Sequence, residues 1–302
     1  MSAVNAIRHF LEIDDLSPAE LLAVLDASEK AHPPLLAGKG VALIFEKPSL
    51  RTRNSCEMAV VQLGGHPAAI FDAEVSLDRR ESTEDVTRTL MGYYHAIAAR
   101  VFEHAKLERM ASVSSVPVIN LLSDAGHPVQ ALADLLTIRQ HVGALRGISI
   151  GWVGDFSNVA RSLSLGAVAL GAHVRVSCPP GYGPTGIDLD HVMSRAQHGA
   201  TITVWPTPAE AVAGAHVVST DAWYSMGQED EREIRKRAFE GFRVDGPLMD
   251  AAEPTAILLH CLPAHRGEEV TSDVLDGSRS RIWSQAHNRM HTFRGLLAWL
   301  CG

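Results

Sequence analysis

The sequence predicts an α/β protein built from two doubly wound parallel-sheet domains. Nine apolar runs of strand length recur along the chain, and segments of helix length lie between most of them. This alternation is typical of parallel sheets that are covered by helices. The chain has 302 residues, of which 46% are hydrophobic, so it is long enough to bury two cores of ordinary size.

The apolar runs are the predicted strands. They lie at residues 41–45, 68–71, 96–101, 116–121, 148–153, 173–177, 200–205, 217–220 and 256–260. The predicted helices include residues 51–63, 82–94, 128–141 and 158–170. We expect the first four strands to form one sheet and the last five to form another.

The change of domain is predicted near residue 140. Pro128 stands where a helix would begin, and that helix runs through Ile138 into the glycine-containing segment 143–147. Segments 182–186 and 228–235 are rich in Gly and Pro or in charge, and both are expected to be loops. The charged residues from 229 to 233 are interpreted as a solvated helix start without chemistry.

The charge and hydropathy of the chain exclude several classes of partner. The net charge is −8, and no Lys/Arg run with interleaved aromatic residues occurs, so no nucleic-acid surface is predicted. The first residues lack a basic region followed by an apolar core, and no stretch approaches the roughly 18 apolar residues that span a bilayer. We therefore expect a cytoplasmic protein without a membrane partner.

The cysteine pattern indicates reduced thiols. The four cysteines are scattered and contain no CxxC spacing: Cys56, Cys178, Cys261 and Cys301. His260, Cys261 and His265 are close in sequence, but adjacent residues leaving a strand tend to point to opposite faces, so no metal site is predicted. A GxGxxG fingerprint is also absent, and no cofactor is expected.

One short segment carries the strongest chemical signal. Ser49-Leu50-Arg51-Thr52-Arg53 follows the first apolar run and opens a predicted helix. Free N–H groups at a helix start, two hydroxyl groups and two guanidinium groups favour binding of a phosphate or similar oxyanion. The alternative is a surface helix start with Ser49 as its cap and solvated arginines.

Other polar residues also follow predicted strands. Arg100 follows the small apolar residues 96–99 of the third run, His127 and Gln130 stand three apart at a helix start, and Asn158 closes a turn after the fifth run. Because ligands of parallel α/β sheets bind beyond the carboxyl ends of the strands, these motifs are predicted to converge on one cleft. The competing interpretations are a strand-end charge for Arg100, core or capping roles for His127 and Gln130, and a simple turn at 154–158.

Four motifs in order resemble those of a known family. SLRTR preceded by Phe-Glu-Lys-Pro, the segment 127–130 (HPVQ), the segment 221–227 (DAWYSMG) and the segment 260–263 (HCLP) resemble the signatures of the carbamoyltransferases, most closely the ornithine carbamoyltransferases. The resemblance extends from residues 8–11 to residues 288–291. It covers nearly the whole chain, and four ordered motifs are more specific than any single one.

The resemblance implies that each domain binds a different substrate. Residues 1–140 with the C-terminal helix 286–302 would form a carbamoyl-phosphate-binding domain, residues 141–285 an ornithine-binding domain, and interdomain helices would join them. The implied carbamoyl-phosphate-binding residues are Ser49, Leu50, Arg51, Thr52, Arg100, His127, Gln130, Cys261, Leu262 and Arg289. The implied ornithine-binding residues are Asn158, Asp221, Ser225 and Met226. Arg51, Arg100 and His127 would stabilise developing charge, while Asp221 and Cys261 would place the attacking amine and help to deprotonate it.

The implied reaction carbamoylates the side-chain amine of L-ornithine with carbamoyl phosphate and gives L-citrulline and phosphate. The resemblance also implies arginine biosynthesis and a homotrimer or a larger trimer-based assembly, with the catabolic reverse direction left open. Alternatives are a carbamoyltransferase for N-acylornithine or putrescine, and a catalytically inactive ligand-binding relative.

The chain departs from the usual family pattern at Leu50, Val129, Ser157 and Ser76. Ser76 stands where a Gln or His usually reaches a neighbouring subunit's phosphate. Arg79 or Arg80 could substitute for that contact.

Overall fold

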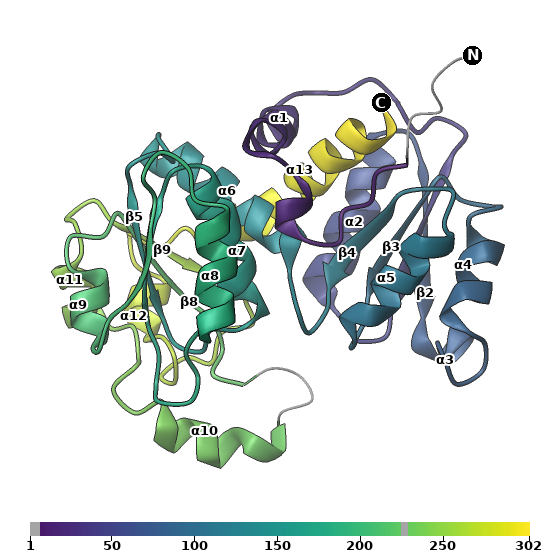
Figure 1. Ribbon diagram of the computed structural model, residues 1–302. Helices are drawn as coiled ribbons and strands as arrows, with labels where there is room; N and C mark the ends of the chain where they lie inside the picture. The colour runs from purple at the N-terminus through teal and green to yellow at the C-terminus, as the bar shows by residue number, and fades with distance from the viewer. Residues whose placement is uncertain (1–6, 225–228) are drawn as a thin grey trace. The chain divides into compact units, whose positions relative to one another are not determined.

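The computed structural model describes residues 7–224 and 229–302 (Figure 1). The strands in these ranges are β1 (Gly40–Phe45), β2 (His66–Phe71), β3 (Ala96–Arg100), β4 (Val118–Leu122), β5 (Ser149–Val153), β6 (His173–Ser177), β7 (Ile202–Val204), β8 (Val217–Thr220) and β9 (Ile257–His260). The helices are α1 (Pro18–Ser28), α2 (Leu50–Gln62), α3 (Asp72–Val75), α4 (Thr83–Leu90), α5 (His104–Val113), α6 (Pro128–Val142), α7 (Asn158–Ala169), α8 (Gly186–Ser194), α9 (Pro208–Val212), α10 (Arg232–Ala238), α11 (Gly246–Ala251), α12 (Ser272–Leu275) and α13 (Ile282–Cys301). Short 3₁₀ turns lie at Ile13–Asp15 and Glu229–Glu231.

The strands form two parallel sheets, as the sequence predicts. The first four strands form a sheet in the order β2-β1-β3-β4, and the last five form a sheet in the order β7-β6-β5-β8-β9. In each sheet the chain first adds strands on one side of its starting strand and then returns to the other side. The two strand orders therefore reverse between β1 and β3 and between β5 and β8, which are the topological switch points where α/β sheets bind ligands.

The chain divides into two compact units. Unit 1 comprises Met1–Leu132 and Arg289–Gly302, and unit 2 comprises Ala133–Asn288. The divisions fall inside α6 and α13, so each of these two helices contributes residues to both units. The boundaries predicted from sequence, at 140/141 and 285/286, lie within the same two helices.

Unit 1 buries its sheet under helices. The central strands β1 and β3 are apolar and buried along almost their whole length, as expected for parallel strands covered on both faces. Ile44 and Ile97 pack with side chains of α4 and α5, including Val86 and Leu107. Helix α13 packs against α1, because Gly295 closely approaches the backbone of Ser28.

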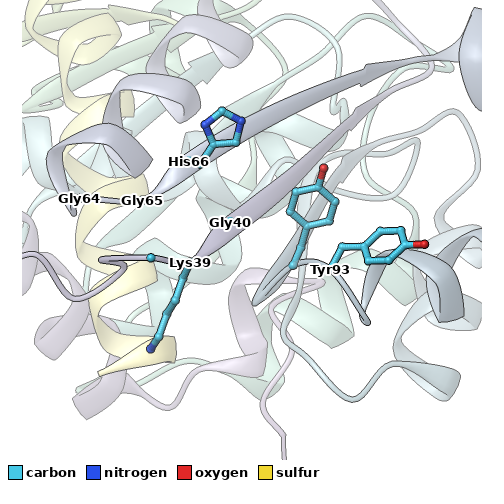
Figure 2. A pocket seen from close by; sticks show the side chains of 8 residues that line it. Lys39, Gly40, Gly64, Gly65, His66 and Tyr93 are labelled. Carbon is cyan, nitrogen blue, oxygen red and sulfur yellow. The ribbon is translucent and has the colours of Figure 1, made fainter.

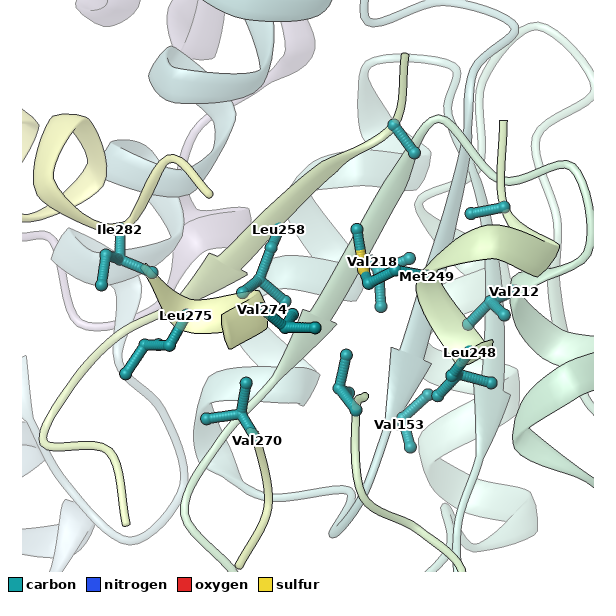
Figure 3. Packing of buried hydrophobic residues seen from close by; sticks show 13 residues of the cluster. Val153, Val212, Val218, Leu248, Met249, Leu258, Val270, Val274, Leu275 and Ile282 are labelled. Carbon is teal, nitrogen blue, oxygen red and sulfur yellow. The ribbon is translucent and has the colours of Figure 1, made fainter. Parts of the chain in front are cut away.

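Unit 2 repeats this arrangement around β5. Side chains from the strands, such as Val153 and Val218, form one buried cluster with Val212 of α9 and Met249 of α11 (Figure 3). Helix α7 contacts the sheet at β6 and carries an almost continuous run of buried residues, which explains why its sequence is apolar on nearly every side.

Two predicted segments differ from the structure. The helix predicted at 82–94 ends at Leu90, because Gly92 disfavours continuation and residues 91–93 form a turn. The loop predicted at 228–235 is helical over its described part, with the turn Glu229–Glu231 leading directly into α10. The interpretation of residues 229–233 as a helix start agrees with this finding. Across the described ranges, no helix combines the length and apolarity that crossing a membrane requires.

Gly295 provides a test of the α13–α1 packing. A Cβ atom at this position would lie 2.4 Å from Ser28 Oγ and 2.7 Å from its backbone nitrogen, so the helices would have to separate. We expect Gly295→Ala to lower the free energy of unfolding by about 1–3 kcal/mol. The control is Gly186→Ala at the start of α8, where a Cβ meets nothing within 4 Å. Urea denaturation curves for Gly295→Ala that coincide with the wild type would contradict this packing.

Candidate active site

The switch points hold most of the predicted site residues. In unit 1, Ser49 follows β1, and Arg100 is the last residue of β3, where it pairs in register with Phe45. In unit 2, Asn158 begins α7 after the turn that follows β5, and Asp221 directly follows β8. Gly154 lets the chain leave β5, because its φ of 127° suits glycine.

The start of α2 is arranged to receive an anion. Ser49 is the N-cap, and its hydroxyl accepts a hydrogen bond from Thr52 N at 3.3 Å. The N–H groups of Leu50 and Arg51 precede the first intrahelical hydrogen bond and are available to a ligand. The Leu50 side chain is 76% exposed, so this residue offers its backbone rather than its side chain. The Arg51 side chain forms no hydrogen bond or ion pair with another described residue.

Arg53 does not join this cluster, which corrects the expectation that both arginines of the motif face one anion. Its Nε donates to Glu57 at 2.8 Å, and its guanidinium group lies over the Phe71 ring at 5.1 Å. Arg53 and Glu57 have the (i, i+4) spacing of helix-surface ion pairs. This spacing is the sequence signal that the Arg53 side chain turns toward Glu57.

Arg289 connects three elements of unit 1. This residue of α13 is 3% exposed, and its guanidinium group donates to Thr52 Oγ1 of α2 at 3.1 Å and to Gln130 Oε1 of α6 at 2.5 Å. Thr52 and Gln130 are themselves buried. The fork of one guanidinium group therefore fixes the start of α2 relative to the start of α6.

His127 lies buried beside two cations. Burial lowers its pKa well below 6.5, and the nearby charges of Arg289 and Arg100 lower it further. The imidazole is therefore neutral at physiological pH, so that one ring nitrogen carries a proton and the other a lone pair. A neutral donor, His127, therefore lies near two positive charges, Arg100 and Arg289, in unit 1.

Asp221 and Cys261 form the corresponding pair in unit 2. The Cys261 thiol donates to Asp221 Oδ1 at 3.1 Å, and the same oxygen accepts a hydrogen bond from Ala222 N at 2.8 Å. Burial raises the pKa of the Asp221 carboxyl group, against the opposing influence of the nearby His260. Leu262 follows Cys261, and a cis peptide bond joins it to Pro263. The sequence predicts that Leu262 contacts the same ligand as the site residues of unit 1.

Behind this pair lies a buried His–Glu contact that the sequence analysis missed. His260 Nε2 is 3.0 Å from Glu269 Oε1, and both side chains are fully buried. His260 Nδ1 accepts a hydrogen bond from Leu262 N at 2.9 Å, so that Nε2 carries the proton toward Glu269. The sequence indicates the burial of Glu269 only through its position next to the apolar Val270, and this signal is weak.

Arg235 of α10 is a second residue that the sequence analysis missed. Its Nη1 donates to Asp155 at 2.8 Å and to the backbone oxygen of Trp223 at 3.0 Å. Burial raises the pKa of Asp155 despite this ion pair. Arg235 therefore ties the turn after β5 to the segment after β8, although its sequence context is that of a solvated charge run.

The described residues contain one cluster with metal-ligand chemistry. One ligand atom each from Asp221, His260 and Cys261 lies within 4.8 Å of the others, so adjacent residues 260 and 261 do not diverge as the strand geometry predicts. However, both ring nitrogens of His260 already have partners, in Leu262 and Glu269. An imidazole in this state offers no lone pair to an ion.

Five predicted positions have other outcomes. Ser225 and Met226 lie outside the described residues. Ser76 caps the end of α3 with a φ of 43°, and its hydroxyl donates to Asp72 O. The side chain therefore stabilises the turn in which it lies. Arg79 pairs with the Asp72 carboxylate, and Arg80 donates to Glu74 O at 3.1 Å, both on the exposed surface.

A cavity of unit 1 lies away from these residues. A cavity of about 490 Å³ is lined by Lys39, Gly40, His66 and Tyr93, among others (Figure 2). Gly40 and His66 begin β1 and β2, so this cavity opens at the amino ends of the strands. No predicted site residue lines it, and α/β sheets bind their ligands at the opposite edge.

Comparisons with known proteins agree with this geometry. Residues 8–140 match the family domain described as "Aspartate/ornithine carbamoyltransferase, carbamoyl-P binding domain", and residues 146–300 match "Aspartate/ornithine carbamoyltransferase, Asp/Orn binding domain". The chain is 47% identical to an ornithine carbamoyltransferase of Acidothermus cellulolyticus, with 97% of this chain and 96% of that protein covered.

Solved structures show the same similarity. An ornithine carbamoyltransferase from Pyrococcus furiosus matches with a TM-score of 0.92 and 42% identity, covering 96% of each chain. An acetylornithine transcarbamylase complexed with acetylcitrulline matches with a TM-score of 0.88 and 30% identity, covering 98% of this chain and all of that one.

The depressed pKa of His127 predicts a pH effect on stability. Below pH 6.5 the unfolded chain takes up a proton at this histidine that the folded chain does not, so the free energy of unfolding falls as the pH decreases. His127→Gln should remove this contribution, which amounts to at most about 1.4 kcal/mol per pH unit. We expect urea denaturation of the variant to be less pH-dependent between pH 6.5 and pH 5 than that of the wild type or of the exposed-site control His95→Gln. Parallel pH profiles for all three proteins would contradict the prediction.

Proposed function

The chain belongs to the aspartate/ornithine carbamoyltransferase family, and we propose that it transfers the carbamoyl group of carbamoyl phosphate to the side-chain amine of L-ornithine, which gives L-citrulline and phosphate. The single observation that carries the proposal is the cluster of Thr52, Gln130, His127, Arg100 and Arg289 at the switch point of unit 1. It offers several cationic and neutral donors to one small anion.

Carbamoyl phosphate binds first through its phosphate in this proposal. The N–H groups at the start of α2 point at the phosphate, and the hydroxyl groups of Ser49 and Thr52 lie beside them. Arg51 supplies a guanidinium group that is not engaged by the described protein. Arg100 lies at the neighbouring strand end and adds a second positive charge, which stabilises the phosphate as it departs.

The carbamoyl group is polarised by the buried residues. Neutral His127 donates to the carbonyl oxygen without having to lose a solvation shell, because it is already buried. Arg289 stabilises the negative charge that develops on the same oxygen. Gln130 holds Arg289 through its Oε1 and lies beside the carbamoyl nitrogen.

The amine is activated by residues of unit 2. The neutral side-chain amine attacks the carbonyl carbon, the C–O bond to phosphate breaks, and the amine loses a proton. Asp221 accepts this proton, and its raised pKa makes the carboxylate a stronger base than an exposed aspartate. Cys261 stays a thiol, places the amine through its contact with Asp221 and, with Leu262, borders the carbamoyl group.

The amino-acid end of ornithine is assigned to Asn158, Ser225 and Met226. Asn158 is the first residue of α7, at the switch point of unit 2. Binding of the α-carboxylate and α-amino groups there leaves the side-chain amine to extend toward Asp221.

N-acylornithine is the second candidate substrate. It is favoured by the similarity to the acetylornithine transcarbamylase, and by Leu50 in place of the more common Thr in the phosphate motif. The higher identity to ornithine carbamoyltransferases, at 42% against 30% among the two solved structures, favours ornithine.

The assembly is proposed to be a homotrimer or a multiple of it, working in the cytoplasm in arginine biosynthesis. Exposed apolar side chains of unit 1 support a contact between copies: Met58 and Val61 on α2 and Phe71 on β2 are 47%, 49% and 37% exposed. β2 is also an edge strand whose outer backbone is unpaired within the sheet. Arg79 or Arg80, on the exposed loop after β2, would reach a neighbouring subunit's phosphate in place of Ser76.

The substrate and the role of Arg51 can be tested together. Carbamoylated product is measured with ornithine, acetylornithine, putrescine and aspartate, and ornithine is expected to give the highest kcat/KM. Arg51→Ala should lower kcat/KM for ornithine carbamoylation by about 100-fold or more. Arg53→Ala removes the same charge from the same helix, but from a side chain that pairs with Glu57. Its kcat/KM should stay within about threefold of the wild-type value.

Two outcomes would contradict the proposal. Absence of turnover with all four amines would favour an inactive ligand-binding protein. Equal kcat/KM values for Arg51→Ala and Arg53→Ala would contradict the role of Arg51 in phosphate binding.

A further inference from the structure

One residue of unit 1 holds the segment between β1 and α2 against the chain that leaves β3. Glu46 directly follows β1 and stands three residues before Ser49, the N-cap of α2. Its backbone nitrogen donates to Arg100 O at 2.9 Å, and its carboxylate accepts from Phe102 N at 2.8 Å and from Lys106 Nζ of α5 at 2.7 Å. The segment that leads to Ser49 is therefore hydrogen-bonded to the chain beyond β3 through both its backbone and a side chain.

Phe102 extends this connection to the segment that carries His127. The backbone nitrogen of Phe102 donates to Glu46, and its backbone oxygen accepts from Asp124 N at 3.0 Å. The segments that follow β1, β3 and β4 are thus joined through the peptide groups of one residue. Because Arg100 and His127 lie in two of these segments, Glu46 connects both to the start of α2.

The Glu46–Lys106 ion pair is largely removed from water. The Glu46 side chain is 4% exposed, and the Lys106 side chain is 12% exposed. A buried charge is costly when its partner is missing. Lys106 therefore compensates the charge of a carboxylate whose second oxygen holds Phe102 N.

The Glu46 carboxylate also lies close to the predicted anion site. The three residues from Glu46 to Ser49 span at most about 10 Å. Salt screens charges over about 8 Å at physiological ionic strength, and it screens buried charges less. Without the ammonium group of Lys106, the Glu46 carboxylate would repel a phosphate bound at the start of α2.

We propose that Glu46 is a positioning residue for the anion site of unit 1, and that Lys106 cancels the Glu46 charge so that the site accepts carbamoyl phosphate. The inference rests on the proposed function. Glu46 acts through the segments that meet at Phe102, and Lys106 acts through Glu46, so neither is a catalytic residue.

Steady-state kinetics with carbamoyl phosphate and ornithine test the charge effect. Lys106→Met removes the ammonium group and should raise KM for carbamoyl phosphate about tenfold. Its kcat should change less than about threefold, because the phosphate is negatively charged in both the ground state and the transition state. Glu46→Gln should not raise KM, because it removes the repelling charge while its side-chain oxygen still accepts from Phe102 N. A purely structural pair would lose the same contact in both variants and would affect KM equally.

A double variant and a truncation separate charge from position. Lys106→Met/Glu46→Gln leaves no uncompensated charge, so its KM should return to within about threefold of the wild-type value. Glu46→Ala leaves Phe102 N without its acceptor and should lower kcat/KM by about tenfold relative to Glu46→Gln. Glu103→Gln is the control, because Glu103 lies 3.8 Å from the same ammonium group but is 70% exposed, and its kcat/KM should stay within about threefold of the wild-type value.

The proposal is overturned if Lys106→Met keeps the wild-type KM, or if Glu46→Gln raises KM as much as Lys106→Met. Equal kcat/KM for Glu46→Ala and Glu46→Gln would overturn the positioning role. If Lys106→Met does not fold, a double variant whose KM stays about tenfold above the wild-type value overturns the charge effect. Wild-type protein without turnover would count against the proposed function, and calorimetric titration of the same variants with inorganic phosphate would then decide this proposal through the same order of Kd values.

Discussion

The buried guanidinium group of Arg289 is the interaction on which the site of unit 1 depends. Removing a charged group from water is costly unless hydrogen bonds compensate. Thr52 and Gln130 provide two of these hydrogen bonds and come from the first turns of α2 and α6. The same charge helps to keep His127 neutral, so one residue of the last helix sets both the geometry and the protonation state of the site. A carbamoyltransferase needs both, because charge develops on two ends of carbamoyl phosphate.

The two units use one topological device for two kinds of chemistry. In each sheet the strand order reverses beside the first strand, and the polar residues follow the strands at that reversal. Unit 1 places cations and helix-start N–H groups there, whereas unit 2 places the Asp221–Cys261 pair, supported by the buried His260–Glu269 contact. The difference lies in short segments after the strands, while the strands themselves supply packing. Fold and chemistry are therefore encoded by different parts of the sequence.

Local patterns explain what could be predicted. The buried parallel strands are continuous apolar runs, so their positions and their division into two sheets followed from the sequence, and Ser49 marked the start of α2. Contacts between distant residues could not be predicted in this way. Arg235 and Asp155 are 80 residues apart, and their pairing depends on where α10 packs rather than on local propensity. The family resemblance supplied Arg289, whose contact with Thr52 spans 237 residues and which periodicity alone would assign to a helix surface.

The most direct test of this account is the effect of Arg289→Lys on kcat/KM for carbamoyl phosphate. An ammonium group keeps the charge but cannot fork between Thr52 and Gln130, so kcat/KM is expected to fall by about 100-fold or more. Arg294→Lys is the matched control in the same helix, because Arg294 contacts Gln62 and the backbone oxygen of Ser28. Its kcat/KM should stay within about threefold of the wild-type value. Wild-type kcat/KM in Arg289→Lys would contradict the central role of the guanidinium fork.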